Sequence, residues 1–145
     1  MAIKQLSIFV ENKSGALADI TGILAENSVD LRALSIAETQ DFGILRLIVN
    51  DTEKAAKVLR DKNCVVNITE ICAVAVPDAP GGLAGVLRVL ADANIVVEYT
   101  YAFISNSGKD AYVVLRINEH DLAKAEKLFK EKNIREIDES DIQSL

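Results

Sequence analysis

Two short segments of this 145-residue chain carry the residue types of an anion-binding helix start. They run from Val10 to Ala18 and from Val76 to Ala84. In each segment a Ser or Pro precedes a glycine, which allows a sharp turn and leaves the first N–H groups of a following helix unpaired. Such a helix start attracts a carboxylate or a phosphate. Asn12 and Asp78, just before the turns, offer oxygens that could accept from an ammonium group, so both loops are candidate receptors for a free amino acid.

The same residue types could also serve folding alone, with Asp78 and Ser14 capping the helices and the glycines making the turns. Between the two loops the second is favoured as the receptor. Pro80 would fix the angle at which the chain enters the helix, and Asp78 carries a full negative charge for the ammonium group. In the first loop Asn12 supplies only a dipole, and Lys13 could either oppose the ammonium group or assist an anionic ligand.

Residues for catalysis or metal binding are sparse. The single histidine, His120, is expected to be a solvated residue in the first turn of a helix. Cys64 and Cys72 neither adjoin it nor form a C-x-x-C pair, and we interpret them as small buried hydrophobic residues rather than a disulfide or redox pair. No G-x-S-x-G elbow, P-loop or G-x-G-x-x-G motif occurs. We therefore expect no catalytic residues, no metal site and no cofactor.

Composition narrows the class of protein further. Half of the residues are apolar, so the chain can bury a core. Sixteen basic residues against 22 acidic ones give a net charge of -6, which argues against nucleic acid as a partner. No apolar run approaches the roughly 20 residues of a membrane-spanning helix, and Met1 to Gln5 leads into a strand pattern rather than a signal peptide. We expect a cytoplasmic protein without a membrane partner.

The chain repeats itself. A shift of 66 residues places Gly81, Leu83, Ala84, Leu90 and Ala91 on Gly15, Leu17, Ala18, Leu24 and Ala25. A shift of 68 then places residues 114–118 on residues 46–50. The sequence therefore predicts two copies of one unit, at residues 1–69 and 70–145, joined at Asn67 to Glu70 without a flexible linker.

Each copy shows the same succession of hydrophobic periods. In the first copy, strand periods are expected at residues 3–10, 29–38, 42–49 and 65–68, and helical periods at 15–27 and after an N-cap at Asn50. In the second copy, strands are expected at residues 72–76, 95–104, 111–117 and 134–137, and helices from Gly81 and after an N-cap at Asn118. The acidic C-terminal end is expected to be solvated and flexible. The order predicts an α+β protein of two tandem ferredoxin-like βαββαβ units, each with a four-stranded antiparallel sheet and two helices on one face.

One face of each predicted sheet lacks helices but carries apolar side chains. They are Phe9, Ile44 and Ile48 in the first copy and Ile71, Ala73, Ala75, Tyr112 and Val114 in the second. Such faces are expected to pack on each other or on another subunit. The strands through Leu34 and Ile36, and through Tyr99 and Tyr101, are expected to join these contacts, which makes a homodimer the expected assembly.

The two loops also resemble a known family signature. Residues 12–17 and 78–83, each after a strand and before a helix, are similar to the D-x-P-G-x-L signature of ACT domains, although Ser14 stands where that family commonly has proline. The resemblance covers nearly the whole chain, twice over. It implies βαββαβ regulatory modules that bind amino acids or other small metabolites, usually at an interface between two modules, and pass the signal to an enzyme.

Candidate ligand contacts come from both loops and, by the resemblance, from a strand of the opposite module. They are Asn12, Ser14, Gly15, Ala16 and Leu17, then Asp78, Ala79, Pro80, Gly81, Gly82 and Leu83, and on the strands Ser35, Ile36, Ala37, Thr100, Tyr101 and Ala102. We expect a non-catalytic protein that senses an amino acid and regulates a metabolic enzyme in trans. A ligand-free interaction protein docking through its sheet faces or edge strands is the alternative. A small enzyme on this scaffold comes third, because no nucleophile or base has a visible partner.

Overall fold

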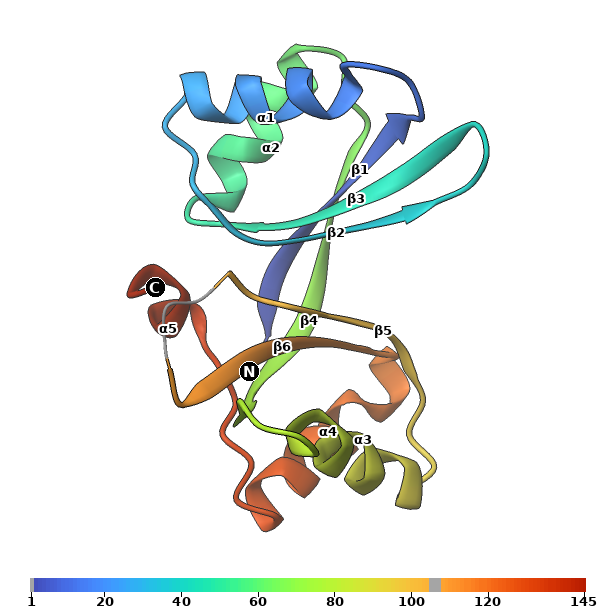
Figure 1. Cartoon of the computed structure of the whole chain (residues 1–145), viewed down its shortest axis with the longest axis vertical. Coiled ribbons are helices and arrows are strands. Elements are labelled where there is room, and N and C mark those ends of the chain that lie inside the picture. The colour runs from blue at the N-terminus through green and yellow to red at the C-terminus, as the bar shows by residue number, and fades with distance from the viewer. Residues whose placement is uncertain (1, 105–107) are drawn as a thin grey trace. The chain divides into compact units, whose positions relative to one another are not determined.

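The computed structural model describes residues 2–104 and 108–145 (Figure 1). The chain divides into two compact units. The first unit comprises Lys4–Glu70, and the second comprises Ile71–Leu145 with the N-terminal end of the chain.

The first unit contains two helices and four strands. In chain order these are β1 (Ile3–Glu11), α1 (Ala16–Glu26), β2 (Leu31–Glu38), β3 (Phe42–Val49), α2 (Thr52–Asp61) and the residues of β4 (Val66–Pro77) up to Glu70. The strands are hydrogen-bonded in the order β2-β3-β1-β4, and β3 is antiparallel to both β1 and β2. Among the described residues β2 is the edge strand of this sheet, so one side of its backbone has no strand neighbour there.

Apolar and polar side chains alternate along the strands, which places the core of the first unit on one face of the sheet. Its fully or nearly fully buried members include Leu6, Ile8, Leu45, Leu47 and Val49 from the strands and Ile20, Leu24, Ala55 and Leu59 from the helices. Both helices cover that face (Figure 1). Every second side chain of β1 and β3 therefore packs under α1 and α2, as the hydrophobic periods predict.

The second unit repeats this order. The end of β4 is followed by α3 (Gly82–Asp92), β5 (Val97–Ala102), β6 (Asp110–Ile117), α4 (Glu119–Glu131) and α5 (Glu139–Gln143). The strand order is β4-β6-β5, again antiparallel. The core includes Cys72, Val74, Val76, Val86, Leu90, Val113, Leu115, Ile117, Ala125 and Phe129. The α+β class with tandem ferredoxin-like units is thus confirmed.

The last strand of the second unit is shorter than predicted. Residues 134–137 make a single bridge, between Val74 and Glu136. Two backbone hydrogen bonds flank it, from Ala75 N to Arg135 O at 2.9 Å and from Ile137 N to Ala73 O at 2.8 Å. The strand ends there because Asp138 is the N-cap of α5.

One of the two predicted asparagine caps is wrong. Asn118 caps α4, since its side chain accepts from His120 N at 2.8 Å. The cap of α2 is Asp51, which accepts from Lys54 N at 3.1 Å. Asn50 instead accepts from Asp30 N at 2.9 Å, so a tertiary contact takes the side chain that the local pattern assigns to the helix.

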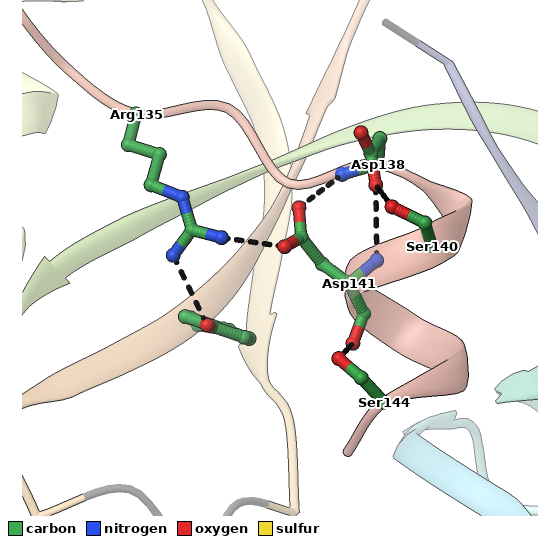
Figure 2. Close-up of polar contacts among 6 residues, drawn as sticks. Arg135, Asp138, Ser140, Asp141 and Ser144 are labelled. Carbon is green, nitrogen blue, oxygen red and sulfur yellow. Dashed lines mark hydrogen bonds and ion pairs between the residues drawn. The ribbon is translucent and has the colours of Figure 1, made fainter.

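The prediction of a flexible acidic C-terminal end is also wrong. Asp138 and Asp141 form a capping box at the start of α5, and Arg135 forms an ion pair with Asp141 (Figure 2). Arg135 also donates to the hydroxyl of Tyr112 at 3.2 Å. Ile142 on α5 is fully buried. The spacing Asp138-x-x-Asp141 before an isoleucine is a capping-box pattern and could have signalled this helix.

The capping box makes the pKa of Asp138 a measurable reporter of α5. The Ser140 hydroxyl, which donates to this carboxylate at 2.6 Å, and the Asp141 N–H at 2.9 Å lower its pKa in the folded chain. Because the pKa of Asp138 is lower in the folded chain than in the unfolded chain, its carboxylate stabilises the fold above the unfolded pKa. This stabilisation is lost as the pH falls through the folded pKa.

We expect Ser140→Ala to raise the Asp138 pKa in a carboxyl NMR titration. Ser144→Ala is the control, because the Ser144 hydroxyl donates to the backbone oxygen of Asp141; an equal rise in both variants would contradict the assignment.

The apolar sheet faces away from the paired helices are buried only in part. Ile48, Ile71, Ala73 and Val114 are at most 1% exposed, and Ala75 and Tyr112 are half-buried. Phe9 and Ile44 remain 49% and 36% exposed. Phe42 stacks on Phe9 with ring centroids 4.7 Å apart. We call Phe9, Phe42 and Ile44 the aromatic patch of the first unit.

Candidate ligand-binding site

The two loops before α1 and α3 have the same backbone geometry. Gly15 and Gly81 have φ values of +86° and +88°, in the left-handed region that favours glycine. Each glycine precedes a helix whose N-terminus has no side-chain cap. The interpretation of Ser14 and Asp78 as helix caps is therefore wrong, and the glycines make the turns as predicted.

The unpaired N–H groups of the two helices begin at the second helical residue. Ala16 N donates to Lys13 O at 3.3 Å, and Gly82 N donates to Ala79 O at 3.0 Å. The first bonds within the helices come from Asp19 N and Gly85 N, at 2.9 Å each. Within the described part of the chain, the N–H groups at positions 17, 18, 83 and 84 have no hydrogen-bond partner. These donors point out of the two positive helix ends.

A cavity of about 130 Å³ lies beside the first loop. Its polar rim consists of the exposed residues Glu11, Asn12, Lys13 and Glu38, and its apolar walls and floor consist of Val10, Ala16, Leu17, Ile36, Gly43 and Leu45. The cavity thus combines β1, the loop, the start of α1 and the ends of β2 and β3. It brings together five predicted site residues: Asn12, Ala16, Leu17 and Ile36 line it, and Gly15 makes the adjoining turn.

Three polar contacts hold the rim of this cavity. The Asn12 side-chain amide donates to Thr39 O at 3.4 Å and to Gln40 O at 3.2 Å, which ties the loop to the turn between β2 and β3. Lys13 forms an ion pair with Glu11 at 3.2 Å. Because Glu11 partly neutralises Lys13, this lysine opposes a ligand's ammonium group less than the sequence suggests.

The second loop adjoins a different kind of hollow. It is a broad open depression of about 380 Å³, lined by Pro77, Gly81, Gly82, Gly85, Val86, Val89, Lys132 and Ile134. Asp78, Ala79, Pro80 and Leu83 are outside this lining. Gly82 approaches Pro77 so closely that a Cβ at residue 82 would lie 2.0 Å from the Pro77 oxygen.

Only some of the strand residues that the sequence predicts as ligand contacts lie at a cavity. Ile36 lines the cavity of its own unit, whereas Ser35 and Ala37 pair with Arg46 and Ile44 on the opposite face of the sheet. On β5 the Thr100 hydroxyl donates to Val114 O at 2.6 Å. Tyr101 stacks on Tyr99 with centroids 6.3 Å apart, and Ala102 is exposed.

Three residues of the cavity lining could not be predicted from the loop segment itself. Glu38, Gly43 and Leu45 come from β2 and β3, which the sheet register brings beside the loop. Gly43 is the one residue with a readable signal, because a glycine inside a strand often marks a close approach of a ligand or another backbone.

The described residues contain neither a cluster of side chains that could bind a metal ion nor a helix that could span a membrane. Across residues 2–104 and 108–145, no group of three or more His, Cys, Asp and Glu side chains could hold a metal ion. In the same ranges no helix has the length and apolar character needed to cross a membrane.

Both cysteines are free thiols, as predicted. Cys72 is fully buried, and its thiol donates to Leu115 O at 3.2 Å. Burial, helped by the charge of Glu136, raises its pKa to about 12. The pKa of the half-buried Cys64 is also raised by burial.

We therefore expect Cys64 of the native protein to react slowly with a disulfide reagent at pH 8, while the buried Cys72 does not react. In denaturant both thiols should react rapidly. Cys64→Ser should leave the native protein unlabelled. Equal reaction rates of the two thiols in the native state would contradict the burial of Cys72.

Comparisons with known proteins agree with this architecture. A crystal structure of protein BT0572 from Bacteroides thetaiotaomicron has 45% sequence identity and a TM-score of 0.90, covering 100% of this chain and 98% of that one. The ligand-free regulatory subunit of aspartate kinase from Thermus thermophilus has 13% identity and a TM-score of 0.62, over 88% of this chain and 90% of that chain, which is a likeness of fold.

A sequence relative gives a shorter match. The acetolactate synthase small subunit of Buchnera aphidicola subsp. Baizongia pistaciae is 29% identical over 72 residues, or 46% of this chain. The match covers 45% of that curated relative, less than half of its length. A family model described as ACT domain pair, by contrast, matches residues 1–145. The chain belongs to the ACT domain pair family.

Proposed function

We propose that this protein is a non-catalytic regulator that senses a free α-amino acid in the cavity beside the first loop. The observation that carries the proposal is that cavity: a partly open pocket with an apolar floor, next to unpaired N–H donors at the start of α1. Leu17 N and Ala18 N would receive the ligand's carboxylate. Glu38 at the rim would accept from its ammonium group.

This placement differs from the preference drawn from the sequence. Asp78 at the second loop supplies the charge that favoured that loop, but Asp78 is outside the lining of the neighbouring depression. We keep the second loop as a secondary candidate, with donors at Leu83 N and Ala84 N. A second copy of the chain could complete either site through an edge strand, so we also propose a homodimer.

The wider role follows from the family and its relatives. One structural neighbour is named a regulatory subunit of aspartate kinase and one sequence relative a small subunit of acetolactate synthase. These names support action on a separate metabolic enzyme in trans. We further propose that residues 1–69 and 70–145 are the two ACT modules and that the protein is cytoplasmic.

A thermal-shift screen with the twenty common amino acids tests the proposal. A ligand at 100 times its dissociation constant should stabilise the protein by about 2.7 kcal/mol. Calorimetry on each positive amino acid then measures its affinity. If none of them binds the native protein, the sensing proposal fails.

The ligand-free interaction protein is the second candidate. It is favoured by the aromatic patch, where Phe9, Phe42 and Ile44 are each at least 36% exposed on one sheet face. Phe9→Ser should then abolish binding to a partner enzyme in a pull-down assay while leaving amino-acid affinity unchanged.

A further inference from the structure

We infer that the cavity beside the first loop selects amino acids with a short aliphatic side chain, of alanine to valine size, and that Gly43 sets this limit. The inference rests on the proposed function and names the ligand class of that site. The cavity is divided into a charged rim and an apolar floor.

The floor carries no group that could pair with a charge. Val10 and Leu45 are 8% and 2% exposed, and Gly43 between them is buried. Ile36 and Leu17 form the walls. A charged side chain placed on this floor would lose its hydration without gaining a partner, whereas an aliphatic side chain would lose only its contact with water.

The backbone conformation at residue 43 does not require glycine, but the space around a Cβ there is limited. It lies within β3, opposite Val10 of β1 and Glu38 of β2, and its φ is not positive. An added Cβ would lie 3.5 Å from Ile36 Cγ2 and 3.2 Å from Ala37 O. The missing methyl group therefore leaves open the part of the cavity next to Ile36.

The second unit provides an internal comparison. Val76 of β4 pairs with Ala111 of β6, as Val10 pairs with Gly43 in the first unit. The second unit thus has a methyl group where the first has none, and its hollow lies elsewhere, against Gly85 and Val89. The smaller and less open of the two hollows lies beside the strand pair that contains glycine.

The volume of the cavity limits how much of a side chain it can cover. At about 130 Å³ it is far smaller than the roughly 300–1,000 Å³ of sites for drug-sized ligands. With the ligand's carboxylate at the start of α1 and its ammonium group at the rim, the remaining space over Gly43 fits a short side chain. An aromatic ring exceeds this space, so it would either displace Ile36 or Leu17 or leave much of its surface in contact with solvent.

Calorimetry with glycine, alanine, valine, leucine, phenylalanine, lysine and aspartate tests this selectivity. For the native protein we expect alanine or valine to bind at least about tenfold more tightly than phenylalanine, lysine or aspartate. Gly43→Ala should weaken valine binding about tenfold and change glycine and alanine binding much less. Ala111→Gly, the matching change in the second unit, should leave the whole series unchanged.

A second variant keeps the test valid if Gly43→Ala unfolds the protein. Ile36 is 41% exposed, so Ile36→Ala should fold and shift the preference toward leucine; Leu34→Ala, an exposed residue of the same strand outside the cavity, should not. Equal binding of charged or aromatic amino acids, or an equal loss across the series in Gly43→Ala, overturns the inference but leaves amino-acid sensing intact. Absence of all amino-acid binding by the native protein overturns the proposed function itself.

Discussion

Replacing Gly82 by alanine should destabilise the protein by about 2–3 kcal/mol, the range for forcing an extra carbon into a packed site. The added Cβ would lie 2.0 Å from the Pro77 carbonyl oxygen and 3.1 Å from its carbon. The oxygen cannot simply move away, because it accepts the turn hydrogen bond from Ala79 N at 2.9 Å. Urea denaturation of the purified variant measures the loss in the free energy of unfolding.

Gly85 in the same helix provides a matched control with the opposite sign. A Cβ at residue 85 meets no atom within 4 Å. Gly85→Ala should therefore stabilise the protein by roughly 0.5–1 kcal/mol, through helix propensity and lower entropy of the unfolded chain. Equal effects of the two substitutions would refute the close approach of Gly82 to Pro77.

Leu17→Glu should abolish amino-acid binding at the first loop without unfolding the protein. The Leu17 side chain lines the cavity and is 43% exposed, so the loss of buried apolar surface is small. A carboxylate in the first turn of α1 also interacts favourably with the positive helix end. The same carboxylate would repel the carboxylate of the ligand, and juxtaposed like charges cost several kcal/mol. We expect at least about a hundredfold loss of affinity by calorimetry, with the melting temperature nearly unchanged.

Leu83→Glu is the matched control at the second loop. Leu83 occupies the corresponding position of α3 and is 36% exposed. If the first loop is the receptor, Leu83→Glu should bind the amino acid as the native protein does. Loss of binding in Leu83→Glu alone would move the receptor to the loop that contains Asp78, and unchanged binding in both variants would exclude both helix starts.

Local sequence patterns determined most of the fold. The alternation of Leu6, Ile8 and Val10 and its match in Cys72, Val74 and Val76 place the same strand under two helices in each unit. The period of a strand or helix depends on neighbours two to four residues apart, which is why single-sequence reasoning can detect it. The turn glycines Gly15 and Gly81 were likewise readable, because few other residues adopt a positive φ at low cost.

Helix caps and the C-terminal end were predicted less accurately from the sequence, because tertiary contacts compete for the same polar groups. Asn50 has the right residue type for a cap, yet its side chain bonds to Asp30 N, from a segment 20 residues earlier. The end of the chain is ordered by Arg135, whose partners Tyr112 and Asp141 lie on different elements. A local pattern supplies a residue of the right type, but the tertiary structure determines its hydrogen-bond partner.

The position of the cavity was decided by tertiary structure alone. Sequence reasoning weighed Asp78 against Asn12, which are local differences between the loops. The floor of the cavity includes Gly43 of β3, which the sheet register brings opposite Val10 of β1. A cavity is bounded by side chains from several elements distant in the chain, so its place follows from how strands pair and helices pack. The sequence alone predicted that two helix starts could receive a carboxylate, and the packing of the sheet decided beside which of them the smaller, partly open cavity lies.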